Sequence, residues 1–516
     1  MQTEKEYMAA REVPGLRCES VGEYSLPDYN TDVKKVLAVR TTAHPSGKFV
    51  GDGTLEICGT VEYNVVYLDP ENKLTHVQFS TDYDAALKIN ADSYVDSDVR
   101  TEVSSYSVRL VGPRKFSVKA VLDSSVALSE RRVYTVGGDA FMEHEPEYLT
   151  DTIKVLSMDF AGADAREFEE EMVSIDGAIL DEVEILLCSA DADIEPCDLS
   201  EGGLALRGSI LVDMLYVNAD AEPIRISKEI PYSEEISLVG ASDYTDACAR
   251  LEISSLKSSA VPTDEGVRLS VSLSATPRVL ARKNTYLNLV TDAFLKERGS
   301  ENEYIDFGYT EFVCSERNEG RFEYRRSLAE LDAEGIKDVM YSHATARIDG
   351  YDTDDGSVNI GGEIKISAIA IEENAEGKRI CTPVRFSLPF EQKVNISCQI
   401  CDNMHLNCHV DVNEVSVLVD ADHLDVTLTV CASVSVYADR RRHCLGSSYV
   451  TDEEYVRDAS VVTVYYPDAT ESLFDIARRF HTSVRSVAES NRLSEAVFSS
   501  SSESLGALGV GKLIIK

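Results

Sequence analysis

The feature that most restricts the fold of this chain is an internal repeat of domain size. Gly59, Gly208 and Gly362 each lie in a strongly apolar run, and they are 149 and 154 residues apart. Tyr83 and Tyr232 each follow the glycine of their copy by 24 residues. Because this spacing is far longer than a solenoid repeat and matches the length of a domain, it predicts three domains in tandem.

The apolar residues within each copy follow the period of β-strands. They alternate with polar residues over short runs, and Gly, Asp, Asn and Pro separate the runs. Such alternation is typical of half-buried antiparallel strands, so we expect a mainly β protein built of sandwich-like domains. A helix is expected only at Ala165–Met172, where Glu, Ala and Arg dominate. The runs in the second half of each copy are Phe116–Leu122, Val267–Leu273 and Leu424–Val430.

Residues 461–516 follow the repeat and predict a small module. Val461–Tyr465 is rich in β-branched and aromatic residues and predicts a strand. Ser472 precedes Asp475 by three residues, a weaker form of the capping box, and marks the start of a helix. The buried face of this helix is expected to consist of Leu473, Ile476, Ala477 and Phe480.

A second helix and a second strand complete the module. Ser483 is placed to cap this helix, and Asn491 suits the left-handed position after its end. Leu513–Ile515 predicts the partner strand, which gives the order β-α-α-β. The buried stripe of the second helix is expected to be Val484, Val487 and Ala488.

This pattern resembles a LysM domain. The family text is a strand, then Gly-Asp-Thr-Leu-Trp with Ile-Ala behind it, then an Asn after the second helix and Pro-Gly before the last strand. Thr470–Phe480, Asn491–Leu493 and Gly511–Ile515 take these places here. The departures, Thr470 and Glu471 among them, fall in the loops that hold N-acetylated glycans in LysM domains. The alternative is a plain amphipathic helical pair. The resemblance places the partner- or glycan-binding residues at Thr470, Glu471, Ser472, Phe474, Arg478, Arg479, Asn491 and Arg492.

Two stretches of the first copy carry a second resemblance. Leu26–Leu37 and Arg109–Ala120 look like the SPOCS domain of clostridial spore proteins. Three such copies before a LysM module resemble the SipL family of spore coat assembly proteins. The resemblance implies a non-enzymatic morphogenetic protein that attaches the coat to the developing spore through an ATPase of the coat basement layer. The expected divisions are an N-terminal segment at 1–20, β domains at 21–150, 151–305 and 306–455, and the LysM-like domain at 456–516.

The charge of the chain restricts its partners. Fifty basic residues face ninety acidic ones, and the formal charge of −40 repels nucleic acid and anionic lipid. Residues 461–516 hold six acids and six bases, so all of the net negative charge lies before them. A neutral module with arginines on its helices is a plausible docking unit. The alternative is that the acids only keep a large β protein soluble.

The sequence predicts a cytoplasmic protein without a transmembrane segment. Met1–Glu6 carries acids where a signal peptide carries bases, and no apolar run reaches the length of a spanning helix. Together with the family resemblance, this places the protein in the mother cell, at the forespore surface and spore coat.

One cysteine cluster raises the question of zinc. Cys398, Cys401 and Cys408 are followed by His409, and such residues are zinc ligands in many small domains. A second Cys-x2-Cys or a His-x3-His is lacking, so we expect dispersed thiols and no metal, with zinc as the alternative.

Catalytic motifs are also lacking. Gly506–Lys512 imitates a phosphate loop, but Leu513 replaces the Ser or Thr that would hold magnesium, and no helix can follow. We therefore expect no cofactor and no enzyme. The sequence favours a scaffold that docks through its LysM-like domain onto the coat basement-layer ATPase and other coat proteins. The alternative is a protein that binds peptidoglycan, a glycan containing N-acetylglucosamine.

Overall fold

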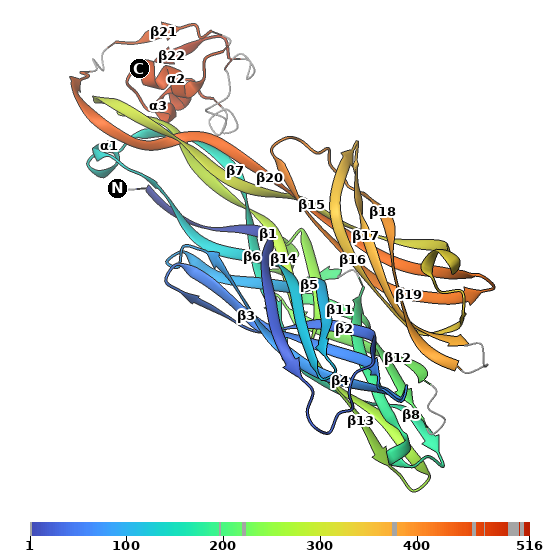
Figure 1. Ribbon diagram of the computed structural model, residues 1–516. Coiled ribbons are helices and arrows are strands. Elements are labelled where there is room, and N and C mark those ends of the chain that lie inside the picture. The colour runs from blue at the N-terminus through green and yellow to red at the C-terminus, as the bar shows by residue number, and fades with distance from the viewer. Residues whose placement is uncertain are drawn as a thin grey trace.

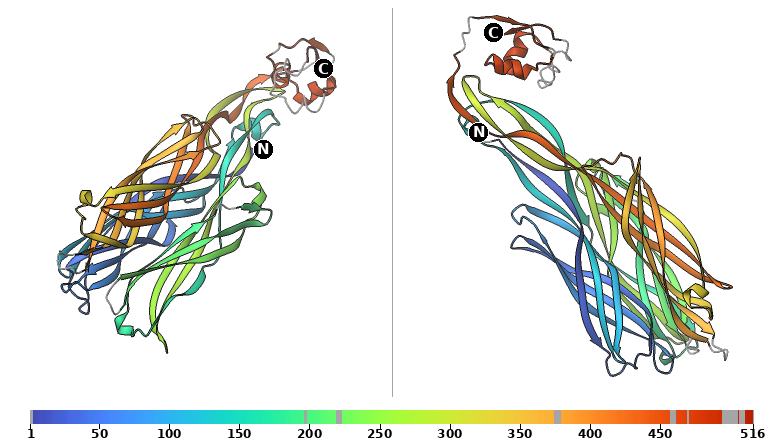
Figure 2. Two further views of the ribbon diagram at one scale, coloured as in Figure 1. Left: turned by 90° about the vertical axis from the view of Figure 1, so that its right-hand side faces the viewer. Right: turned by 45° about the horizontal axis from the view of Figure 1, so that its top comes forward.

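The computed structural model describes residues 3–195, 198–218, 223–373, 379–456, 461–468, 470–493, 505 and 510–515. These residues form six sheets of three or four strands and one sheet of two, with three short α-helices. The prediction of a mainly β protein is therefore confirmed. The molecule is elongated, and the C-terminal helices lie at one end of it (Figures 1 and 2). Among the described residues, no helix is long and apolar enough to cross a membrane.

The six larger sheets form three pairs that share one connectivity. In the first sheet of each pair, the last strand of the copy is central, with the first strand on one side and the second-to-last strand on the other. The strands between them in sequence form a meander, which is the second sheet. Sheet pair 1 consists of β1 (Thr3–Ser25), β2 (Lys35–Gly51), β3 (Thr54–Leu68), β4 (Leu74–Lys88), β5 (Tyr94–Gly112) and β6 (Lys115–Val136).

Sheet pair 2 repeats this plan with two additions. Its first strand is divided into β7 and β8, which both pair with β14, and a short strand β10 extends the meander. Its strands are β7 (Glu147–Gly162), β8 (Arg166–Asp176), β9 (Glu184–Ile194), β10 (Asp198–Ser200), β11 (Gly203–Val217), β12 (Pro223–Ser237), β13 (Asp246–Pro262) and β14 (Gly266–Phe294). Sheet pair 3 consists of β15 (Arg298–Ser327), β16 (Ile336–Asp354), β17 (Ser357–Glu373), β18 (Arg379–Asn395), β19 (Met404–Asp420) and β20 (His423–Glu454).

The repeated glycines are explained by a backbone carbonyl oxygen on the neighbouring strand. An added Cβ would lie 2.4, 2.2 and 2.1 Å from the carbonyl oxygens of His44, Asp193 and Arg347, and an aromatic ring adds to the crowding in the first and third copies. No larger residue therefore fits at these positions. The aromatic residue that faces the glycine follows it by more residues in the third copy than in the second, because β17 and β18 have 17 residues, against 15 in β11 and β12. The facing pairs are Gly59–Tyr83, Gly208–Tyr232 and Gly362–Phe390.

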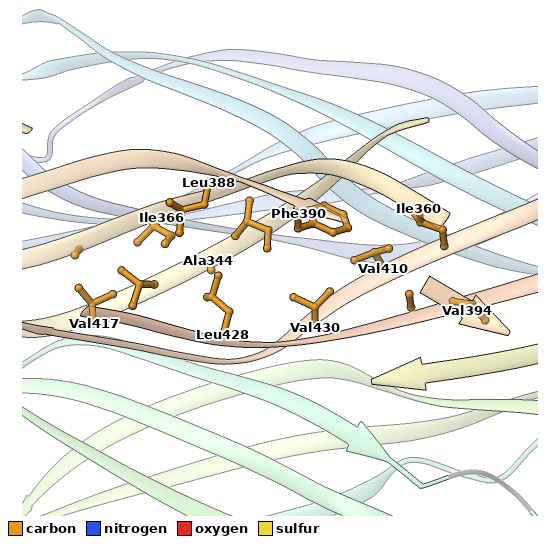
Figure 3. Packing of buried hydrophobic residues seen from close by; sticks show 14 of the residues in the cluster. Ala344, Ile360, Ile366, Leu388, Phe390, Val394, Val410, Val417, Leu428 and Val430 are labelled. Carbon is orange, nitrogen blue, oxygen red and sulfur yellow. The ribbon is translucent and has the colours of Figure 1, made fainter. Parts of the chain in front are cut away.

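Each sheet pair encloses a hydrophobic cluster between its two sheets. In pair 3, Ile360, Ile366 and Leu388 from one sheet face Leu428 and Val430 from the other (Figure 3). The inward side chains lie at every second position, as the alternating pattern predicts. In the second half of each copy the buried set is Phe116, Val118, Ala120 and Leu122; Val267, Leu269, Val271 and Leu273; and Leu424, Val426, Leu428 and Val430.

The three sheet pairs also share cores with one another. One cluster joins Leu37, Leu187 and Tyr341, which come from pairs 1, 2 and 3 in turn. A second cluster joins Ala10, Leu156 and Tyr437 in the same order. The sheet pairs therefore pack side by side as one body, as the parallel courses of their strands in Figure 2 show.

Two buried polar networks accompany these shared clusters. Arg40 of pair 1 donates two hydrogen bonds to the Asp191 carboxylate of pair 2, at 2.7 and 2.6 Å, and one to His343 Nδ1 of pair 3, at 3.0 Å. Arg282, at 4 % exposure, donates to the Tyr437 hydroxyl at 2.9 Å and to Asp246 at 2.7 Å. The residues that complete this second network are Glu12, which pairs with Arg282 at 3.6 Å, and Tyr437, which donates to Glu12.

The longest strands of the protein continue together with β7 toward the C-terminal module (Figure 1). They are β14, β15 and β20, with 29, 30 and 32 residues. A strand of that length spans about 100 Å, since each residue adds about 3.3 Å. The remaining elements are α1 (Asp139–Met142), which the sequence pattern did not predict, β21 (Thr463–Tyr465), α2 (Leu473–Arg479), α3 (Val484–Ser490) and β22 (Leu513–Ile515).

Several sequence-based predictions need correction. Ala165–Met172 is not helical, because Arg166–Asp176 pairs with β14 and this long-range pairing outweighs local helix propensity. The expected N-terminal segment 1–20 lies largely within β1, which pairs with β6 along its length. The boundaries after residues 150 and 305 likewise fall inside β7 and β15, since the first strand of each copy begins earlier than its pattern suggested.

Candidate partner-binding module

The start of α2 is fixed by a complete capping box. The Ser472 hydroxyl accepts from the Asp475 backbone N–H at 3.1 Å, and the Asp475 carboxylate accepts from the Ser472 N–H at 3.0 Å. Two backbone donors of the first turn are satisfied in this way. Ser472 is buried, and its side chain caps the helix. The Ser483 cap of α3 is also confirmed, because its hydroxyl accepts from the Ser486 N–H at 3.0 Å.

The predicted helix faces are largely confirmed. Leu473, Ile476 and Ala477 are buried in α2, and Phe480 lies at its end, half-buried. Val484, Val487 and Ala488 are buried in α3. The first strand is shorter than expected, since β21 begins at Thr463. Val461 and Val462 lie outside it, with exposed side chains.

Glu471 is committed to interactions inside the module. Its carboxylate accepts from the Tyr465 hydroxyl at 2.8 and 3.0 Å and from the Asp468 N–H at 2.9 Å. It also pairs with Arg479 at 2.6 Å. Burial raises the pKa of the Glu471 carboxyl, but the hydrogen bonds from Asp468 and Tyr465 and the Arg479 charge outweigh it and lower the pKa. Glu471 thus fixes the loop before α2, and Arg479 is held beside it.

Asn491 joins α3 to the last strand. Its side-chain amide donates to the Val487 and Ile514 carbonyl oxygens, each at 2.8 Å, and its carbonyl accepts from the Ile514 N–H at 2.6 Å. The prediction of a left-handed conformation at Asn491 is wrong, because its φ is −104°. Arg492 takes that conformation instead, with φ 51°.

Phe474 and Arg478 face the body of the protein. The Phe474 ring, 1 % exposed, meets the Phe294 ring edge to face with the centres 5.1 Å apart. Arg478 forms an ion pair with Asp292 and donates to the Ala293 carbonyl oxygen at 3.3 Å. Its guanidinium carbon also lies 5.0 Å from the centre of the Phe474 ring. Two predicted binding residues therefore belong to an internal joint.

Two further contacts complete this joint, and the sequence pattern revealed neither. The Val484 N–H, at the start of α3, donates to the Glu147 carboxylate of β7 at 3.2 Å. The Tyr455 ring stacks on His481 with the centres 3.6 Å apart. Local periodicity carries no signal for such pairings, because the partners are far apart in the chain or lie outside regular elements.

Thr470 and Arg492 remain exposed in the loops beside the two helices. Within the described part of the chain, the Arg492 side chain makes no hydrogen bond or ion pair, whereas Arg478 and Arg479 make both. Arg479 still leaves 53 % of its side chain exposed. Of the eight residues that the resemblance indicated, Thr470, Arg479 and Arg492 are therefore the three with exposed side chains.

The cysteine cluster is not gathered into a ligand set. Among the described residues, the single group of three candidate ligands within reach of one another is Glu102, His409 and Asp411. Arg100 already occupies this group, with its guanidinium 2.5 Å from Glu102 and 3.1 Å from Asp411. A divalent cation there would be repelled by the guanidinium.

This group joins sheet pairs 1 and 3 as a salt-bridge network. The two carboxylates raise the pKa of His409 although burial lowers it, and His409 and Arg100 lower the pKa of Asp411 although burial raises it. The raised pKa of His409 and the lowered pKa of Asp411 both favour the charged form of the group. The arrangement therefore stabilises an interface between strands β5 and β19.

A comparison with protein-family models and with curated proteins finds no match to this chain.

Proposed function

We propose that this protein is a non-enzymatic scaffold of the spore coat that docks through its C-terminal module onto the coat basement-layer ATPase. The observation that carries the proposal is the position of the module at the end of the elongated body (Figure 1). A module held there presents its outer loops away from the body. The three sheet pairs would then be tandem SPOCS-like β domains that recruit other coat proteins, in the mother cell and at the forespore surface.

The surface proposed for the ATPase is formed by Thr470, Arg479 and Arg492. These side chains are exposed and cationic or neutral, whereas the chain as a whole carries a formal charge of −40. Residues 461–516 carry no net charge, so a partner with acidic groups is repelled less by the module than by the acidic body, and its acids can pair with these arginines. Such complementarity raises association rates and selects against wrong partners. The order β21, α2, α3, β22 and the antiparallel pairing of β21 with β22 support the LysM-like interpretation.

The surface can be tested with the full chain and the purified ATPase. Arg492→Glu should weaken binding at least about tenfold while the melting temperature stays the same, because surface substitutions change stability by less than about 0.5 kcal/mol. Arg485→Glu is a matched control, since Arg485 is 78 % exposed on α3 and, among the residues that the structure describes, pairs with its helical neighbour Glu489 alone. Equal losses for both variants would show that net charge alone decides binding and would contradict the proposed surface.

A parallel sedimentation of the full chain with peptidoglycan tests the glycan alternative. The scaffold proposal predicts that the chain stays in the supernatant. Pelleting that is lost on Thr470→Ala, together with unchanged ATPase binding by Arg492→Glu, would replace the scaffold by a glycan-binding protein.

A further inference from the structure

Two cysteine sulfurs lie in contact in sheet pair 3. Cys314 of β15 and Cys398, in the segment between β18 and β19, place their Sγ atoms 3.4 Å apart. Cys314 is 9 % exposed, and both side chains pack on the hydrophobic cluster of this sheet pair. A disulfide needs a sulfur separation of about 2.05 Å, so the two sulfurs have to approach by roughly 1.4 Å. Side-chain rotation can supply such a movement.

The backbone around Cys398 is held on both sides. The Ile396 N–H donates to the Gly356 carbonyl oxygen at 2.9 Å, and the Met404 N–H donates to the Cys401 carbonyl oxygen at 2.9 Å. The Gln399 amide donates to Asp355 at 2.9 Å. These hydrogen bonds keep the Cys398 thiol beside the Cys314 thiol. A disulfide between the two can therefore form without a search over alternative loop conformations.

We propose that Cys314 and Cys398 form an oxidation site, which a peroxide converts into a reversible disulfide between β15 and the segment 396–403. Because 84 residues separate the two cysteines, the bond closes a long loop of the chain. Closing such a loop restricts the unfolded state and stabilises the fold. This proposal does not depend on the proposed function.

The exposed thiol of Cys401 is the group that reacts first with the oxidant. Burial raises the pKa of Cys398 to about 12, and the neighbouring Cys314 and Cys401 add to the rise, so Cys398 itself is slow to form a thiolate. Cys401 follows three residues later in the same held segment, and its side chain is exposed. Peroxide can therefore reach the Cys401 sulfur directly.

The reaction balances with hydrogen peroxide as oxidant. The Cys401 thiolate attacks one peroxide oxygen, the O–O bond breaks, and hydroxide leaves to become water. The Cys398 thiol then attacks the Cys401 sulfur, an S–S bond forms, and the second oxygen leaves as water. Attack of Cys314 on the Cys398 sulfur forms the final bond and returns Cys401 to a thiol. Two thiols lose two protons and two electrons, and the peroxide becomes two waters.

The full-length chain can test this site directly. After treatment with one equivalent of hydrogen peroxide and alkylation of the remaining thiols, peptide mapping without reductant should give a Cys314–Cys398 crosslink that dithiothreitol removes. The oxidised protein should melt at a higher temperature than the reduced one, and Cys398→Ser should abolish both effects. Cys408→Ser, in the same hydrophobic cluster, is the matched control and should retain both.

Two outcomes would overturn the proposal. If Cys314 and Cys398 stay fully alkylated while exposed cysteines are oxidised, the pair is not an oxidation site. Crosslinks scattered over other cysteine pairs would lead to the same conclusion. Cys401→Ser should slow formation of the crosslink by about tenfold or more, because it removes the accessible sulfur that peroxide reaches first. An unchanged rate would show that the peroxide reaches the buried pair without Cys401.

Discussion

The three sheet pairs are joined to one another by different contacts from those that join the C-terminal module to them. Sheet pairs 1, 2 and 3 meet through shared hydrophobic clusters and through the networks of Arg40 and Arg282, each of which has partners in more than one pair. The module meets the body at the end of β14, through the Phe474–Phe294 contact and the Arg478 interactions. The first junction is buried and the second is half-exposed at Arg478. The body should therefore unfold as one block, whereas the module, which has fewer contacts with it, should separate from the body more readily.

The largest expected effect concerns a single sheet pair expressed alone. The repeat pattern suggests that residues 21–150 fold by themselves, but this fragment lacks most of β1 and leaves β6 with an unpaired edge. It also exposes the side of the shared cluster that contains Leu37, Val66 and Leu68. We expect it to aggregate or to remain unfolded, measured by size-exclusion chromatography and far-ultraviolet circular dichroism. A monomeric fragment that melts cooperatively would show that the sheet pairs are independent.

Removing the buried arginine of the body should have the next largest effect. Arg282→Ala leaves the Glu12 and Asp246 carboxylates without their cation, and breaking a buried ion pair in this way costs about 3–5 kcal/mol. Urea unfolding of the full chain measures the loss. Arg278→Ala, on the same strand, is the control, because the Arg278 side chain is 49 % exposed and its pair with Glu252 contributes about 0–1 kcal/mol. Equal losses would mean that burial at the junction does not matter.

These two tests concern contacts that sequence patterns do not reveal. Period-two alternation predicted the strands and their buried faces, and the side chains of Ser472 and Ser483 predicted the helix caps, because both depend on residues close together in the chain. Arg40 and Arg282 occupy polar positions of alternating strands. Such a position faces either water or a neighbouring sheet pair, and only the packing of the three pairs decides which.

The same limit explains the errors in the module and in β8. Arg478 was expected on a free surface because it lies off the apolar stripe of its helix, yet β14 covers that side. Ala165–Met172 has a helical composition, yet its pairing with β14 makes a strand. In both places a distant segment of the chain determines the outcome.

The pH dependence of stability should separate the buried junction from the surface. Burial and the neighbouring Arg40 charge together lower the pKa of His343 from 6.5 to about 3, although Asp191 opposes the shift. Between these two values the unfolded chain binds a proton that the folded chain does not, so stability falls as the pH falls below about 6.5.

The comparison of His343→Gln with the wild type isolates this contribution. Between pH 7 and pH 5 the wild type should lose about 2 kcal/mol more than the variant, since a single proton is involved. His443→Gln is the control, because His443 is 67 % exposed. Urea unfolding at the two pH values gives the difference, and identical slopes for His343→Gln and the wild type would contradict the depressed pKa.

The smallest expected effect is at the joint between the module and the body. Arg478→Ala removes the ion pair with Asp292 and the hydrogen bond to Ala293, and because the Arg478 side chain is 40 % exposed, the loss should be under about 1 kcal/mol. The global unfolding curve should barely change. Opening of the joint should increase, and the Val484 amide reports it, since this N–H bonds to Glu147 of the body only while the module is docked.

Hydrogen exchange at the Val484 amide therefore tests whether Arg478 helps to hold the module against the body or lies on a free surface. In Arg478→Ala the exchange rate at Val484 should rise about two- to fivefold, the change that corresponds to about 0.5–1 kcal/mol of docking free energy. Arg485→Ala removes a pair confined to α3 and should leave the rate unchanged. If Arg478→Ala also leaves it unchanged, the Phe474–Phe294, Val484–Glu147 and Tyr455–His481 contacts hold the module without Arg478. Arg478 would then become a fourth member of the surface that we propose for the ATPase, and its charge reversal should weaken that binding as Arg492→Glu does.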